Sequence, residues 1–297
     1  MSMLRIGQDT AVAAPRTAPR TRALRLVRRG LLYAALSAGA FLMVVPFLWM
    51  VSTSFKTLDQ VFAFPPQWIP NPWVFENYVR AMTISPFDIY FLNTAKIAVL
   101  VTLGQLFTCS LAGYTFARLR FPGRDAIFLV YIATMMIPGM VTIIPVFVVM
   151  KTLDLVDTHT AVIVPHLASA FGTFLSRQFY LTMPAELEDA AKIDGSGYFG
   201  IYARIFLPLS KPLLATLGVF VFMGQWNDFF WPLIMLQTQA KKTLTLGLME
   251  FRNLAFGLAE WHLMMAGAVV ALLPILIVFA LAQRLFVRGI ALSGIKG

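Results

Sequence analysis

The sequence predicts an all-α, polytopic membrane protein. Hydrophobic residues make up 59% of the 297 residues, charged residues only 13%, and the mean hydropathy is +0.75. The apolar residues are gathered into long runs. Only helices and closed barrels can span a bilayer, and these runs are too long and uniform to be barrel strands. The composition therefore excludes a soluble globular domain.

Six apolar runs are each long enough to cross about 30 Å of hydrocarbon at about 1.5 Å per residue. The first run follows a basic segment, as in a signal peptide, but it exceeds the usual hydrophobic region of about 7–15 residues, so we expect an uncleaved helix. The stretch "FPPQWIPNPWVFENY" after it is too broken to span. The six predicted spans are residues 30–52, 91–117, 126–149, 160–179, 212–236 and 262–285.

The distribution of Lys and Arg predicts the orientation of these spans. If the N-terminus is inside, 17 of the 24 Lys and Arg residues lie on cytoplasmic segments and 7 on outer segments. The positive-inside rule then places both termini in the cytoplasm. The same distribution accounts for the net charge of +10 without nucleic acid as a partner.

This topology divides the chain into four parts. Residues 1–29 form a basic, disordered cytoplasmic tail, and residues 30–90 form the first span and an extracytoplasmic segment. Residues 91–285 form a five-helix core that contains a polar cytoplasmic loop at 182–212. Residues 286–297 form a cytoplasmic C-terminal tail.

The polar loop begins with acidic residues at the start of a short helix. Glu186, Glu188 and Asp189 follow Pro184, and negative charge is favoured near a helix N-terminus. Gly195 and Gly197 then supply a break. The sequence predicts a helix and a turn on the cytoplasmic surface.

The second half of the loop predicts another short helix over 198–206, which Pro208 ends. Tyr198, Ile201, Tyr202 and Ile205 recur at helical spacing and form one apolar face. Such a face suits docking into a groove on a cytoplasmic partner. The alternative is a loop that only folds back on the helix bundle.

The spacing within this loop resembles the EAA motif of ABC importer permeases. That motif reads E-A-A, three residues, G, nine residues, I-x-L-P, and this chain departs from it only by Asp in place of the first Glu. "FLNTAKIAVLVTLGQLFTCSLAGYTFARLRFPGRD", "GQWNDFFWPLIML" and "GIALSGIKG" resemble the carbohydrate-uptake branch, in particular the subunit type of the maltose permease G component. The resemblance covers residues 30–297. Asp189 stands where the motif has its first Glu, and the matching positions are Ala190, Ala191, Gly195, Ile205, Leu207 and Pro208.

The resemblance implies a type-1 importer fold in the inner membrane of a prokaryote. It implies a pore shared with a second, homologous permease chain, a homodimeric cytoplasmic ABC ATPase that binds ATP and magnesium, and an extracytoplasmic solute-binding protein. The substrate would be a carbohydrate or a related solute, such as an oligosaccharide or a sugar or glycerol phosphate. The residues that it assigns to the ATPase-coupling loop are Glu186, Glu188, Asp189, Ala190, Ala191, Asp194, Gly195, Ile205, Leu207 and Pro208.

The chain itself is not expected to be an enzyme or to bind a cofactor. A P-loop requires a Gly-Lys dipeptide, and the sequence has none. The single Cys109 and the scattered His159, His166 and His262 predict no metal site. The alternatives from other classes are an ion-gradient-driven secondary transporter, a membrane-embedded enzyme and a structural scaffold.

A polar segment inside the fifth span is the candidate translocation path. An ionisable residue within a span is costly and usually faces a cavity or a partner. Asn and Asp can bond sugar hydroxyls and Trp can stack on a sugar ring, but the same residues could clamp neighbouring helices. The segment comprises Gln225, Trp226, Asn227 and Asp228.

Overall fold

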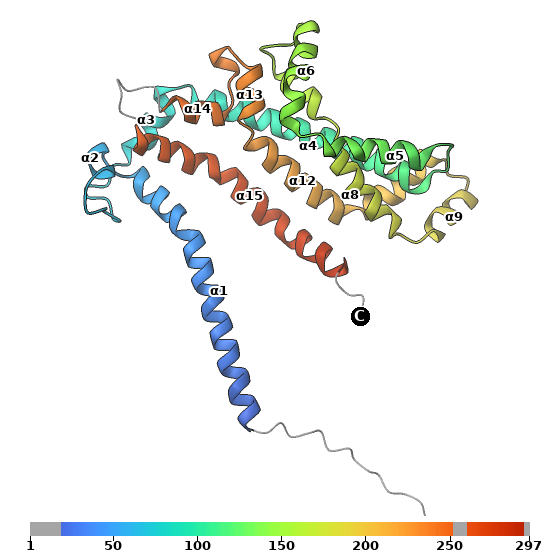
Figure 1. Cartoon of the computed structure of the whole chain (residues 1–297), viewed down its shortest axis with the longest axis horizontal. Coiled ribbons are helices and arrows are strands. Elements are labelled where there is room, and N and C mark those ends of the chain that lie inside the picture. The colour runs from blue at the N-terminus through green and yellow to red at the C-terminus, as the bar shows by residue number, and fades with distance from the viewer. Residues whose placement is uncertain (1–18, 252–259, 294–297) are drawn as a thin grey trace, which may run out of the picture. The chain divides into compact units, whose positions relative to one another are not determined.

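The computed structural model describes residues 19–251 and 260–293 (Figure 1). Within these ranges the chain is helical and contains no strand. In the part of the chain that the structure describes, three helices are long and apolar enough to cross a membrane, and there are up to five spans if each of two sharply bent helix pairs counts as one. The all-α prediction is confirmed.

The first helix, α1 (Pro19–Ser54), begins inside the segment that the sequence predicts to be a disordered tail. Proline is favoured at a helix start, and the Arg, Ala and Leu residues that follow are strong helix formers. The remainder of the predicted tail, residues 1–18, lies outside the described residues. The residues up to Trp49 form a structural unit of their own, and the rest of the described chain forms a second unit.

The stretch after α1 is broken into short helices, as its Pro content predicts. α2 (Leu58–Val61) and α3 (Glu76–Ile84) are separated by irregular chain, and the ring of Phe55 packs against Trp73, Phe75 and Tyr78 with centroids 5.1–5.3 Å apart. The next helix, α4 (Phe87–Arg118), starts four residues before the predicted span.

Helix α4 is the centre of the second unit. It packs against α8 (Ala170–Leu181), α12 (Lys211–Trp226) and α14 (Leu244–Glu250), and α12 also packs against α15 (Trp261–Ser293) (Figure 1). The contact between α4 and α8 uses small residues, which allow backbones in a membrane protein to approach closely. A Cβ added to Gly172 would lie 2.8 Å from the Cys109 sulfur.

Three of the predicted spans are interrupted in the structure. In the third, α5 (Arg124–Ala133) and the 3₁₀ turn Thr134–Met136 are followed, after Pro138, by α6 (Gly139–Thr152), and the pair is bent by 102°. In the fourth, α7 (His159–Ile163) and the 3₁₀ turn Val164–His166 precede α8. In the fifth, α12 ends at Trp226 and α13 (Phe230–Met235) begins four residues later.

Each interruption falls where the sequence offers a reason for it. Proline removes a backbone donor at 138 and 165, and the polar Asn227 and Asp228 bond to backbone groups at the third break. By contrast, Pro46, Pro145 and Pro274 lie inside continuous helices. A short 3₁₀ turn, Gln239–Lys241, joins α13 to α14.

Candidate functional site

The polar loop forms a helix and a turn, as predicted from the sequence. α9 (Glu186–Ile193) carries Glu186, Glu188 and Asp189 in its first turn, where negative charge is stabilised by the helix dipole. Helix α9 starts two residues after Pro184 and does not include it. Glu188 is buried, and its Oε1 lies 2.8 Å from Nζ of Lys192 one turn later, which raises the pKa of Lys192.

Gly195 ends α9 in the manner that the sequence predicts. Its φ is +77°, a conformation that costs an L-residue with a side chain about 1–2 kcal/mol. The amide of Gly195 donates to the carbonyl of Lys192 (3.0 Å) and that of Ser196 to the carbonyl of Ala191 (2.9 Å), which is the Schellman pattern. Gly197 has an ordinary φ of −74°, so only the first of the two glycines is required by the backbone.

The second half of the loop differs from the predicted helix in its end and in its buried face. It consists of α10 (Tyr198–Ile201), a π-helical turn (Tyr202–Phe206) and α11 (Leu207–Leu209), so the helix continues past Pro208. Pro208 is tolerated because it stands in the first turn of α11. Ile201 and Tyr202 belong to the apolar face that the sequence suggested for docking to a partner, but both are buried against the chain's own helices. Tyr198, from the same predicted face, is 58% exposed.

One side of the loop is anchored to the helix bundle. Ala191 of α9 belongs to a buried cluster with residues of α4, α8 and the π-helical turn, and Ile205 and Leu207 pack against this cluster. Its buried members are Tyr114, Ala117, Tyr180, Ala191, Ile201, Tyr202, Phe206 and Leu213. The loop therefore does fold back on the bundle, as the simpler alternative expected.

The other side of the loop presents apolar and acidic side chains to the outside. Ile193 is 87% exposed and Phe199 is 64% exposed. Glu186, Asp189 and Asp194 are also exposed, and none of the three forms an ion pair with another residue in the described parts of the chain. Exposed apolar side chains rimmed by charge are typical of a protein–protein contact surface.

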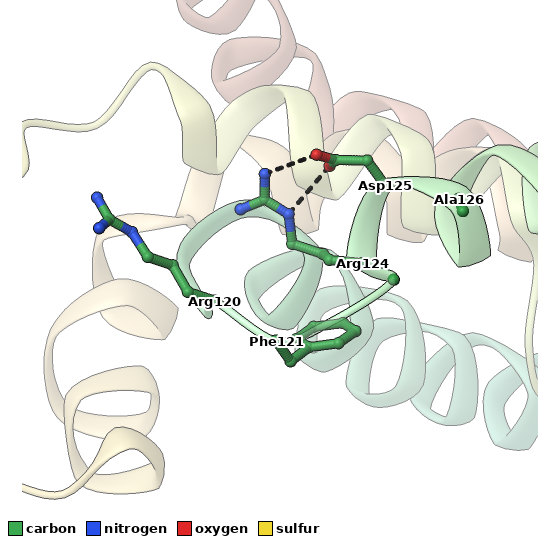
Figure 2. Close-up of a pocket in the computed structure, with 6 residues that line it drawn as sticks. Arg120, Phe121, Arg124, Asp125 and Ala126 are labelled. Atoms are coloured by element: carbon green, nitrogen blue, oxygen red, sulfur yellow. Dashed lines mark hydrogen bonds and ion pairs between the residues drawn. The ribbon is translucent and has the colours of Figure 1, made fainter.

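A polar cavity lies between this loop and the end of α4. Its volume is about 530 Å³, and it is lined by Arg118, Arg120 and Arg124 on one side and by Glu188, Asp189 and Lys192 on the other. A second cavity, of about 410 Å³, adjoins the start of α5 (Figure 2). There the Arg124 guanidinium donates to both carboxylate oxygens of Asp125, at 3.0 and 3.1 Å. The side chain of Arg120 points away from this pair.

The polar segment at residues 225–228 lies where α12 ends. Trp226 is buried; its Nε1 donates to the carbonyl of Ala271 in α15 (3.0 Å), and its ring stacks on Phe222. Asn227 is exposed, and its amide donates to the carbonyl of Met223 (2.9 Å). The Trp226 contacts are those of a clamp between α12 and α15.

Asp228 and Gln225 differ from Trp226 in their surroundings. Asp228 is half-buried; its Oδ1 accepts from the amide of Trp231 at 3.4 Å, and its carbonyl accepts from the Thr245 hydroxyl at 2.7 Å. Oε1 of Gln225 is buried without a hydrogen-bond partner among the described residues. The sequence had predicted that Asp228 lies within a continuous helix. In the structure it lies between α12 and α13, and its side chain accepts from an amide in the first turn of α13.

Metal-ligating residues do not cluster within the described ranges: no group of three or more His, Cys, Asp or Glu side chains could hold an ion there. His166 is a packing residue, since its Nδ1 donates to the carbonyl of Val162 (2.9 Å) and its ring meets Trp231 edge to face. His159 donates to the carbonyl of Lys241 (3.0 Å), and Cys109 is buried.

A comparison with known families matches residues 109–292 to the binding-protein-dependent transport system inner membrane component. This match covers more than half of the chain, including the whole of the polar loop. The chain belongs to this permease family. The family that the EAA spacing indicated is therefore confirmed.

Individual relatives cover most of the permease. The lactose transport system permease protein LacG of Rhizobium radiobacter is 37% identical over 257 residues, which is 86% of this chain and 93% of the relative. The sn-glycerol-3-phosphate transport system permease protein UgpE of Yersinia pestis bv. Antiqua (strain Antiqua) is 35% identical over 238 residues, 78% of this chain and 85% of the relative.

A solved structure has the same fold as the permease. It is a crystal structure of a bacterial ABC transporter involved in the import of the acidic polysaccharide alginate, with a TM-score of 0.78, 23% identity, and coverage of 91% of this chain and 99% of that one. The permease is thus a multi-pass inner-membrane subunit of an ATP-driven importer, and it is not itself an enzyme because the ATPase is a separate subunit.

The structure also reveals two polar centres of the permease that sequence reasoning missed. Asp157, which has a φ of +62°, accepts from the amides of Gln237 and Thr238 (both 2.9 Å), from the Thr238 hydroxyl (2.6 Å) and from Nζ of Lys241 (2.9 Å). These bonds, led by those from Thr238, hold the pKa of Asp157 well below its ordinary value.

The second centre is built around Glu250 in α14. Its carboxylate accepts from Lys242 (2.8 Å), Tyr90 (3.1 Å), Ser85 (3.1 Å) and Gln239 (3.0 Å). Burial raises the pKa of Glu250, but the bonds from Lys242, Tyr90 and Ser85 outweigh it, so the pKa lies below its ordinary value. Asp157 and Gln237 are 80 positions apart, and Tyr90 and Glu250 are 160 apart. The only sequence signal that could have indicated these centres is an acid near a lysine in a polar connection.

Proposed function

We propose that this permease forms half of a carbohydrate-import pore together with a second, homologous permease chain. Substrate reaches the pore from an extracytoplasmic solute-binding protein, and a homodimeric ABC ATPase that holds ATP and magnesium drives the cycle. LacG and UgpE support a sugar or a sugar or glycerol phosphate as the substrate class. The proposed position is the inner membrane of a prokaryote, with membrane lipid around the bundle.

The proposed topology has six crossings and both termini in the cytoplasm. The positive-inside count supports it, with 17 Lys and Arg residues on the proposed inner side. Residues 159–181, which comprise α7, a 3₁₀ turn and α8, form the fourth crossing. The alternative, an ion-gradient-driven transporter, is not supported, because the family of this chain depends on a binding protein.

The proposed mechanism rests on the two different faces of the polar loop. One face is buried against α4 and α8, and the other exposes Ile193 and Phe199 beside unpaired acids. A rigid element held by the bundle on one side and by a partner on the other can transmit displacement between them. We propose that the exposed face docks into the ATPase and that Glu186, Asp189 and Asp194 supply its charge. This face comprises Glu186, Asp189, Asp194, Ile193 and Phe199.

The residues at the end of α12 have different roles in this proposal. Asn227 and Asp228 line the path, since they stand at a helix break where polar groups are tolerated only beside a cavity or a partner. Trp226 holds α12 against α15. Gln225, whose buried Oε1 has no hydrogen-bond partner among the described residues, is the group that a substrate hydroxyl would satisfy.

Two glycines in one turn provide a matched test of the loop. Gly195→Pro forces a φ near −65° where the backbone has +77°, so the turn must reorganise. Gly197→Ala introduces a Cβ at φ −74° with no atom within 4 Å, so it should be neutral. The complex is purified through a tag on this chain, and the retained ATPase and its ATP hydrolysis are measured.

The expected result is retention of the ATPase by the natural chain and by Gly197→Ala, with loss of the ATPase or of its coupling in Gly195→Pro. If the natural chain retains no nucleotide-binding partner, the proposed function is wrong. If both variants behave as the natural chain, the loop is not the docking element.

A further inference from the structure

The last three turns of α4 present a stripe of polar side chains to the coupling loop. Ser110, Tyr114 and Arg118 recur every four residues, so they lie on one face of the helix. The Ser110 and Tyr202 hydroxyls are 2.7 Å apart, and the Tyr114 hydroxyl donates to the carbonyl of Tyr198 at 3.4 Å. The stripe therefore touches the loop at successive points along α4.

Arg118 is the member of this stripe that holds the start of the loop. One nitrogen of its guanidinium, Nη2, donates to the carbonyl of Tyr180 at 2.7 Å and also to the carbonyl of Met183. Tyr180 lies in the last turn of α8, where carbonyl groups lack helical partners. Arg118 thus satisfies these carbonyls and fixes the chain that leads into α9.

The same guanidinium also contacts the end of the loop. Its carbon lies 5.0 Å from the centroid of the Phe206 ring, within the range of a cation–π contact. Phe206 is buried and directly precedes α11, after which the chain bends by 78° into α12. One side chain on α4 therefore contacts the chain that enters the coupling loop and the chain that leaves it.

We propose that Arg118 is a positioning residue that makes the coupling loop and α4 move as one body when the ATPase closes. This inference rests on the proposed function, because it requires that the ATPase displaces α9. Arginine is suited to this role since its planar fork can donate in several directions while its face stacks on a ring. A lysine would keep the charge but would lose the stacked plane and the fixed donor geometry.

The test measures whether α9 and α4 keep their separation during the nucleotide cycle. Spin labels are placed at Gly197→Cys in the loop and at Leu103→Cys, an exposed position on α4, in a Cys109→Ala background. Distances are recorded by double electron–electron resonance on the purified complex with its ATPase, without nucleotide and with Mg-ATP plus vanadate. The variants are Arg118→Met, Arg118→Lys and, as the matched control, Arg120→Met, since Arg120 makes no hydrogen bond or ion pair within the described ranges.

The proposal predicts one distance for the natural chain and for Arg120→Met in both states. Arg118→Met keeps that distance without nucleotide and shifts or broadens it with Mg-ATP and vanadate, and Arg118→Lys gives a smaller change in the same direction. The proposal is overturned if Arg118→Met matches the natural chain in both states. It is also overturned if the distance is already altered without nucleotide and does not respond to it, because that result describes a purely structural role.

If Arg118→Met does not assemble, Arg118→Lys decides by the same comparison: a shift that depends on nucleotide supports the proposal, and its absence overturns it. If the natural chain purifies without an ATPase, the proposed function has failed instead.

Discussion

A Cβ added to Gly113 of α4 would lie only 2.4 Å from the Cβ of Ser176 in α8. The backbone amide of Arg177 would be 2.8 Å away, so the obstruction includes rigid main chain and cannot be relieved by a side-chain rotation. The polar loop packs against both of these tightly packed helices.

Gly113→Ala should destabilise the permease by separating α4 from α8. Overpacking of a well-packed interior typically costs about 1–3 kcal/mol. The matched control is Gly224→Ala in α12, where the added Cβ meets no atom within 4 Å. Thermal unfolding in detergent should show a lower midpoint for Gly113→Ala and an unchanged or slightly higher one for Gly224→Ala. Equal midpoints for the two variants would contradict the packing described above.

Asp157→Asn should loosen the connection between α13 and α14. The change removes the charge that Lys241 pairs with and weakens acceptors for two amides, and hydrogen bonds to charged groups contribute about 1.5–3 kcal/mol each. Hydrogen exchange read by mass spectrometry should be faster at Gln237 and Thr238. Asp154→Asn, a change at a nearby residue that also has positive φ, is the control. Unaltered protection at 237 and 238 in Asp157→Asn would show that this centre does not hold the connection.

The pKa of Asp157 also sets the pH range over which Asp157 stabilises the connection between α13 and α14. Because the folded pKa is lowered, the stabilisation is fully present above the unfolded value of about 3.9 and is lost only as the pH falls through the folded pKa. Protection at Gln237 and Thr238, corrected for intrinsic exchange rates, should therefore be constant between about pH 5 and 8. A loss of protection within that range would require another titrating group.

Ile193→Ser should weaken the hold on the ATPase without destabilising the permease. Ile193 is 87% exposed, so little packing within the chain is lost. Removing an apolar anchor from the centre of an interface typically costs about 2 kcal/mol or more of binding free energy, which is roughly a 30-fold loss of affinity. Ile127→Ser is the control, because Ile127 is also exposed but lies on α5. The measurements are retained ATPase and unfolding midpoint, and equal retention in the two variants would remove Ile193 from the docking face.

Asn227→Ala and Trp226→Phe should distinguish a residue that lines the translocation path from a residue that holds α12 against α15. Among the described residues, the Asn227 side-chain amide bonds only to Met223 of α12, so its loss should reduce uptake of labelled sugar while leaving the unfolding midpoint nearly unchanged. Trp226→Phe removes the bond to Ala271 and should cost about 1 kcal/mol of stability with little effect on uptake by assembled complex. The reverse pattern would place the clamp at Asn227.

The fold class and the helix and turn of the polar loop could be predicted because their signals are local. Hydropathy over a window reports a span, and the spacing from Asp189 to Pro208 reports the loop directly. The left-handed conformation of Gly195 was predictable for the same reason, since a glycine after a short helix is the usual C-terminal signal.

The helix breaks could not be placed from hydropathy averages, and the side-chain partners could not be predicted from local signals. Window averages pass over single residues such as Pro138 and Asp228, where the helices are in fact interrupted. Asp157 and Gln237 are 80 positions apart, and nothing local links them. In the sequence Arg118 contributes only a charge to the orientation of the spans, whereas its contacts depend on how α4 meets α8 and Phe206.

Photo-crosslinking from the exposed face of α9 tests the central claim most directly. A photoreactive amino acid is placed at position 193 in the full complex in its native membrane, with position 127 on α5 as the control, and crosslinked partners are identified by mass spectrometry. The account predicts that position 193 crosslinks to a nucleotide-binding ABC ATPase and that position 127 does not. Crosslinks from position 193 only to lipid or to this chain itself would contradict the docking of this loop to the ATPase.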